Sequence, residues 1–142
     1  MKKPVLSKTA GWLVLAVLVF VDSLLTKIRG EEGNPLWKPV VEVIGTDNVF
    51  ILVIPVLLIL FIGVKAISLL VKKIDKTPMA EELILTTMVI IFAFYDLWVI
   101  SVDFFSFRMI TDFRKLIIPL IAIGLIYSLW AESKLKKILH SK

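Results

Sequence analysis

The sequence predicts an all-α membrane protein, a bundle of four transmembrane helices, from three observations. Hydrophobic residues make up 58% of the 142 residues, whereas about 45–50% is usual for a soluble domain. The mean hydropathy is +0.93. Charged residues mostly flank four apolar runs, and each run approaches the roughly 20 residues that a helix needs to cross a bilayer core about 30 Å thick. We therefore expect a single membrane domain over residues 1–142.

The first apolar run, residues 10–26, is the first predicted span. A cleaved signal peptide is the alternative, because such a peptide also places an apolar segment after a basic start. No cleavage site of the small-x-small type follows the run, and Asp22 would lie inside its apolar part. These features favour an uncleaved helix.

The segment after the first span predicts a short helix of its own. Asn34 and Pro35 form a favourable start, since Asn caps a first turn and Pro fits the first helical position. Pro39 interrupts the pattern because it lacks an amide donor. Up to Gly45, apolar residues recur at helical spacing: Leu36, Trp37, Val40, Val41 and Ile44. We expect a broken amphipathic helix on the outer membrane surface, with Trp37 at headgroup depth, or else an ordered loop that Trp37 anchors.

The remaining spans are predicted over residues 49–71, 83–105 and 116–131. Before the third span, Thr77 is the expected cap and Pro78 the first helical residue. Glu81 and Glu82 then suit the positive end of the helix dipole. After the fourth span, the basic end of the chain is expected to continue the helix along the inner leaflet.

Lysine and arginine predict the orientation, because cytoplasmic loops carry an excess of basic residues. With the N-terminus inside, eleven are cytoplasmic, namely Lys2, Lys3, Lys8, Lys65, Lys72, Lys73, Lys76, Lys134, Lys136, Lys137 and Lys142. Six are then outside, namely Lys27, Arg29, Lys38, Arg108, Arg114 and Lys115. We therefore expect a multi-pass protein of the plasma membrane with both termini in the cytoplasm.

Composition excludes several classes of site. The chain has no cysteine, which removes disulfides, zinc–thiolate sites, iron–sulfur clusters and cysteine nucleophiles, and no cofactor is expected. The net charge is +5, but basic residues flank apolar runs and form no single stripe, so nucleic-acid binding is not expected. Glutamine is absent and asparagine occurs only as Asn34 and Asn48, a scarcity typical both of thermophile proteins and of membrane proteins.

Two acidic residues lie well inside predicted spans, Asp22 in the first and Asp96 in the third, while Asp103 lies at the outer end of the third. Ionisable groups inside a membrane are costly, so they are candidates for function. Both spans run in the same direction, which puts the two carboxylates at a similar depth. If the helices are neighbours, the pair could share a proton or supply oxygen ligands to a hard cation.

Further candidates follow these acids at helical spacing. Thr26 and Arg29 follow Asp22 by four and seven residues, and Asp103 follows Asp96 by seven, so each shares a helix face with its acid. Together with Tyr95, they predict an acid-lined groove that opens outward, with two arginines at its mouth, Arg29 and Arg108. The alternatives are buried structural acids that accept hydrogen bonds across helices, and acids that pair at a subunit interface.

The motif Asp22-x-x-x-Thr26, followed by Gly30 and by Glu32-Gly33-Asn34-Pro35, resembles the N-terminal pattern of a family of small archaeal and bacterial membrane proteins. That family is known as a domain of unknown function. The resemblance covers about the first quarter of the chain and implies a helical membrane fold without a particular activity. It also implies that Asp22, Glu32 and Asn34 belong to a shared site.

Several functions stay open on the sequence. No Ser–His–Asp set, HExxH motif, phosphate loop or dinucleotide fingerprint is present. Small size, short loops and few catalytic groups favour an accessory or scaffolding subunit of a membrane complex. An oligomeric proton- or cation-coupled transporter that uses Asp22 and Asp96 is the alternative, and an intramembrane carboxylate-dependent enzyme ranks third. The expected partners are the lipid bilayer and either further copies of the chain or larger membrane subunits.

Overall fold

The computed structural model describes residues 3–106, 110 and 112–140, and these residues form helices and loops without any strand. The prediction of an all-α fold is confirmed. In chain order the described elements are α1 (Lys8–Arg29), α2 (Lys38–Ile44), the 3-10 helix η1 (Thr46–Leu52), α3 (Val53–Asp75), α4 (Ala80–Phe105) and α5 (Phe113–His140).

Within the described residues, four helical segments are long and apolar enough to cross a membrane. They are Lys8–Arg29, Thr46–Asp75, Ala80–Phe105 and Phe113–Ile138, and each contains one predicted span. The second is the longest, at 30 residues, because η1 runs directly into α3. The four segments are compatible with a multi-pass membrane protein, as predicted.

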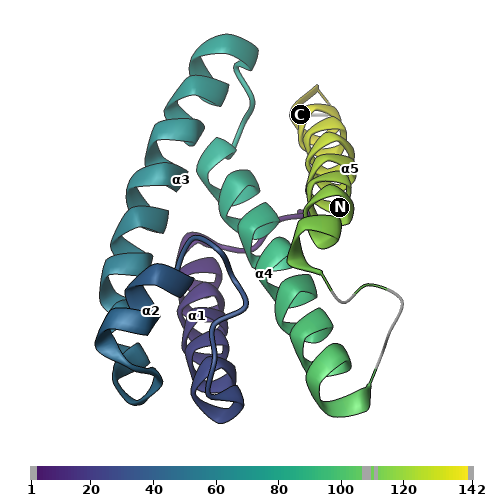
Figure 1. Cartoon of the computed structure of the whole chain (residues 1–142). Helices are drawn as coiled ribbons and strands as arrows, with labels where there is room; N and C mark the ends of the chain where they lie inside the picture. Colours follow the sequence, from purple (N-terminus) through teal and green to yellow (C-terminus); the bar gives the residue numbers. More distant parts are fainter. Residues whose placement is uncertain (1–2, 107–109, 111, 141–142) are drawn as a thin grey trace.

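Helix α4 is the centre of the bundle. It packs against α1, α3 and α5, whereas α5 packs against α4 alone among the described helices. Figure 1 shows α1 and α3 on one side of α4 and α5 on the other. Two glycines permit this packing, since a Cβ atom at Gly11 of α1 would lie 2.5 Å from Leu85, and one at Gly124 of α5 would lie 2.8 Å from Ile91.

Ion pairs and hydrogen bonds define two ends of the bundle. At one end Lys8 pairs with Glu81, and at the other Arg29 pairs with Asp103, so α1 and α4 run in the same direction. The end with Lys8 and Glu81 is called the strap end, because residues 4–6 cross it as a strap. There the Leu6 amide donates to the Thr86 hydroxyl at 3.0 Å. The opposite end, which holds α2 and its loop, is called the loop end.

The buried side chains form three clusters along the bundle. At the strap end, α1, α3 and α4 share a cluster around Leu15 and Leu85, which have no exposed surface. Nearby, Leu83 of α4 packs on Ala131 of α5. At the loop end, Val99 and its neighbours join α4 to α1 and α5. The bundle therefore has three apolar clusters along its length, and α4 contributes to each of them.

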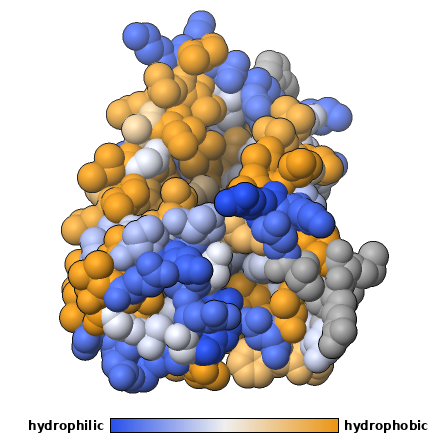
Figure 2. Space-filling view, in the orientation of Figure 1, coloured by the Kyte–Doolittle hydropathy of each residue, from blue (hydrophilic) through white to orange (hydrophobic). Residues whose placement is uncertain are grey.

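Helix α3 lies at the edge and is the least buried of the long helices. Within the most apolar stretch of each span, 6% of the residues are buried for Thr46–Asp75, against 39% for Ala80–Phe105. Figure 2 shows apolar surface over α3, while hydrophilic side chains gather over α2 and the loop before it. An apolar helix with so little internal burial is suited to contact with lipid or with another chain.

Two predicted helix starts are wrong in detail. Helix α4 begins at Ala80 after Met79, which has a left-handed backbone (φ 53°) and makes no side-chain cap. Thr77 caps nothing there, because its hydroxyl instead donates to Glu132 of α5 at 3.0 Å. A contact between this loop and α5 has displaced the local capping interaction.

The second displaced start is that of α2, which begins at Lys38 and not at Pro35. Asn34 still organises a turn, because its side-chain oxygen accepts from the Leu36 amide at 3.0 Å and its carbonyl accepts from the Lys38 amide at 2.9 Å. Pro39 therefore falls in the first turn of α2, where its missing amide costs no hydrogen bond. The predicted conflict at Pro39 disappears.

Candidate functional site

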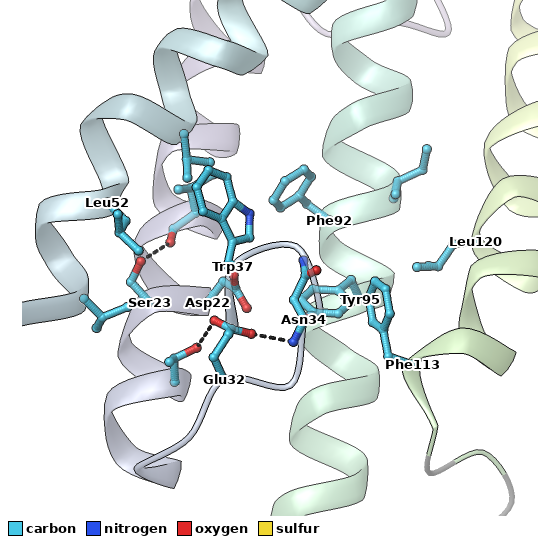
Figure 3. A pocket seen from close by; sticks show the side chains of 15 residues that line it. Asp22, Ser23, Glu32, Asn34, Trp37, Leu52, Phe92, Tyr95, Phe113 and Leu120 are labelled. Atoms are coloured by element: carbon cyan, nitrogen blue, oxygen red, sulfur yellow. Dashed lines mark hydrogen bonds between the residues drawn. The ribbon is translucent and has the colours of Figure 1, made fainter. Parts of the chain in front are cut away.

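A cavity of about 180 Å³ lies at the loop end, between α1, η1, α3, α4 and α5. Figure 3 shows side chains from these elements around it, with the loop between α1 and α2 passing over them. Its polar lining comes from Asp22, Ser23, Thr26, Glu32 and Asn34. Its aromatic lining comes from Trp37, Phe92, Tyr95 and Phe113.

Glu32 holds the loop against α1. Helix α1 ends at Gly30, whose left-handed backbone (φ 74°) turns the chain back over the helix. One Glu32 oxygen then accepts from the Thr26 hydroxyl at 3.1 Å, and the other accepts from the Asn34 amide at 2.7 Å. Because Thr26 has no exposed surface and Glu32 is 8% exposed, these bonds lie away from solvent.

Asp22 presents a carboxylate to the same cavity. It is partly buried on α1, and its Oδ1 atom is fully buried without a hydrogen-bond partner among the described residues. Both Glu32 and Arg29 are close enough to act on it electrostatically. In Figure 3, Asp22 lies beside Glu32 and near Trp37. This oxygen is an acceptor that the described part of the chain leaves unused.

Asp96 is a buried acid of α4. It is 4% exposed, and neither of its carboxylate oxygens has a partner among the described residues. The charge of Asp22 is close enough to act on it. Asp96 is not part of the cavity lining, whereas its neighbour Tyr95 is. The structure thus brings the two predicted acids together, but only Asp22 lines the cavity.

Arg29 and Asp103 form an ion pair apart from the cavity. The Nη1 atom of Arg29 lies 3.2 Å from Oδ2 of Asp103, which joins the end of α1 to the end of α4. The Nε and Nη2 atoms of Arg29 are buried without partners among the described residues. Asp103 therefore serves a helix contact and does not line the cavity. Arg108, the second arginine predicted at the mouth of the groove, lies outside the described residues.

Apart from Tyr95, the aromatic lining of the cavity was not predicted. Trp37, expected at headgroup depth, is partly buried and lines the cavity. Its position three residues after Asn34 is a signal that could have placed it there. Phe113 had no such signal, because it comes from the start of α5 and reaches the site only through helix packing. Its ring meets that of Tyr95 nearly at a right angle, with 5.8 Å between centroids.

The described residues do not favour a metal site. No group of three or more His, Cys, Asp or Glu residues among them is arranged to hold a metal ion. Hard cations such as Ca²⁺ take about six to eight oxygen ligands, and much of this cavity is aromatic or aliphatic.

Comparisons with known protein families, with curated proteins and with solved structures find no match to this chain. The candidate site therefore rests on its own geometry.

Proposed function

We propose that this protein is an oligomeric membrane transporter that binds a proton or a cation at Asp22, with Glu32 and Asp96 as supporting negative charges. One observation carries the proposal. A cavity inside a single chain is lined by two carboxylates and, among its described lining residues, by no lysine or arginine. A desolvated carboxylate without a partner is costly in a membrane, and a bound proton or cation removes that cost.

The proposed orientation puts the loop end outside the cell and both termini in the cytoplasm, in the plasma membrane. The strap side carries eleven basic residues and the loop side six. By the positive-inside rule, the side with more basic residues is cytoplasmic. In this orientation α2 would lie at the outer membrane surface. Val43, 86% exposed, would face the headgroup region, while Val41, 3% exposed, packs inward.

The resemblance to the family of unknown function is also a proposal. Its motif residues Asp22, Thr26, Glu32 and Asn34 all line the one cavity. Four motif positions from a helix and from the loop after it would not meet in this way by helical spacing alone. Their convergence supports the shared site that the resemblance implies.

An accessory or scaffolding subunit is the second candidate function, and the exposure of α3 favours it. Large apolar side chains of α3 such as Ile54, Ile62 and Leu69 are 66–68% exposed within the chain. A larger membrane subunit or a second copy of this chain could cover them. This role needs no cavity, so the two candidates differ in what the carboxylates do.

Proton flux into liposomes that contain the purified protein tests the proposal. Asp22→Asn and Glu32→Gln should each abolish the flux, since each removes a charge from the cavity. Glu31→Gln is the matched control, because Glu31 is exposed and adjoins Glu32. Equal flux in all variants, or none in the wild type together with recovery in a larger native complex, would favour the subunit role.

A further inference from the structure

The cavity at the loop end restricts its ligand by its aromatic side chains and its volume as well as by its charge. We infer that its ligand is a small organic ammonium ion, held between the Asp22 carboxylate and the aromatic side chains. The inference rests on the proposed function and names the substrate class of the same site.

The charge of the lining favours a cation. The cavity lining includes two acidic residues, Asp22 and Glu32, and no lysine, arginine or histidine among its described members. Glu32 already uses its two oxygens on Thr26 and Asn34. Asp22 keeps a buried oxygen without a partner among the described residues. Asp22 also lines the cavity and is only partly buried, so its carboxylate is the direct counter-ion, and Glu32 adds a second negative charge nearby.

The aromatic part of the lining favours an organic cation over a metal ion. Aromatic faces attract cations that lie within about 6 Å of the ring centroid, and they bind alkylated ammonium groups without oxygen ligands. Tyr95 and Phe113 form a corner, with an interplanar angle of 85°. Trp37 and Phe92 add two further rings to the lining. A metal ion would gain less from these surfaces than it loses with its water and oxygen ligands.

The volume sets the size of the ligand. A cavity of about 150 Å³ accommodates benzene, and this one measures about 180 Å³. Choline or a similar ammonium ion fits that space, whereas tetraphenylphosphonium does not. A proton alone would need no cavity of this size. Volume, charge and ring placement thus agree on one ligand class.

Calorimetric titration of the full chain in lipid nanodiscs tests the inference. Choline should bind saturably, and dimethylbutanol, its uncharged isostere, should bind at least about tenfold more weakly because it lacks the charge that Asp22 and the rings recognise. Sodium ions and tetraphenylphosphonium should fail to displace choline. Equal binding of the isostere, or displacement by sodium, would overturn the inference.

Two variants locate the binding. Asp22→Asn should weaken choline at least about tenfold and Trp37→Leu severalfold, because one removes the counter-ion and the other a ring. Glu31→Gln should bind as the wild type does. Unchanged binding in a folded Trp37→Leu or Asp22→Asn protein would refute the site. If no ammonium ion binds while proton flux still requires Asp22, the inference fails and the proposed function stands.

Discussion

Both ends of the bundle hold ion pairs, but among the described residues only the loop end also holds buried carboxylate oxygens without partners. At the strap end Glu81 pairs with Lys65 at 2.6 Å and with Lys8 at 2.9 Å. At the loop end Asp22 and Asp96 have buried carboxylate oxygens without partners among the described residues. A membrane protein gains stability by pairing its charges, so acids left unpaired cost stability. The pairs at the strap end favour stability, whereas the unpaired acids of the loop end fit the ligand binding that we propose there.

The largest effect should come from the core of the strap end. Leu85→Ala should lower the free energy of unfolding by about 2–5 kcal/mol, because Leu85 has no exposed surface and its loss leaves a cavity. Denaturation in mixed micelles, followed by tryptophan fluorescence, measures the change. Ile62→Ala is the control, since Ile62 is 66% exposed. An equal loss in both variants would contradict this account of the core.

The contact between α1 and α4 should be the next most sensitive feature. Gly11→Ala should destabilise by about 1–3 kcal/mol, because the added Cβ would lie 2.5 Å from a buried Leu85 atom. Gly63→Ala is the matched control, since nothing lies within 4 Å of a Cβ there. That control should be neutral or slightly stabilising, because alanine favours a helix. A neutral Gly11→Ala would mean that the two helices are farther apart.

The hydrogen bond from Thr26 to Glu32, here called the clamp, should contribute somewhat less to the free energy of unfolding than the contact between α1 and α4. Thr26→Val removes the hydroxyl that donates to Glu32, and a buried oxygen without its donor costs about 1–3 kcal/mol. Proteolysis between residues 30 and 37 should also become faster, because the loop loses the hydrogen bond that ties Glu32 to α1. Thr9→Val, at an exposed position, should change neither quantity. A loop that stays equally protected in Thr26→Val would show that the clamp is dispensable.

The smallest effect should come from the ion pairs of the strap end. Lys65→Met should cost less than about 1 kcal/mol, since Lys65 is 42% exposed at its side chain and exposed pairs contribute little. Glu81 also keeps its second partner, Lys8. The same denaturation assay applies. A loss of several kcal/mol would show that this end depends on its charges more than on its apolar core.

Local sequence patterns were enough to predict the helices. The four apolar runs predicted four long helices because a membrane-crossing chain must satisfy its backbone within each segment. The errors lie at boundaries. Thr77 was expected to cap α4 but bonds Glu132 across the bundle, a choice that no local pattern could reveal. The early start of the second span at Thr46 arises from a 3-10 helix that continues into α3.

The site was predictable only where its residues are near in sequence. Asp22, Thr26, Glu32 and Asn34 belong to one short motif, and they line one cavity. The rest depends on which helices pack together. Phe113 reaches the cavity because α5 packs against α4, and helix periodicity carries no information about such a contact.

The most direct test of the difference between the two ends is the stability of Asp22→Asn together with its ligand binding. The account predicts a free energy of unfolding equal to or above that of the wild type, because the substitution removes a buried charge that lacks a partner. It also predicts the loss of choline binding and of proton flux. A variant destabilised by more than about 1 kcal/mol that still binds choline would show Asp22 to be a structural acid, and would contradict the account.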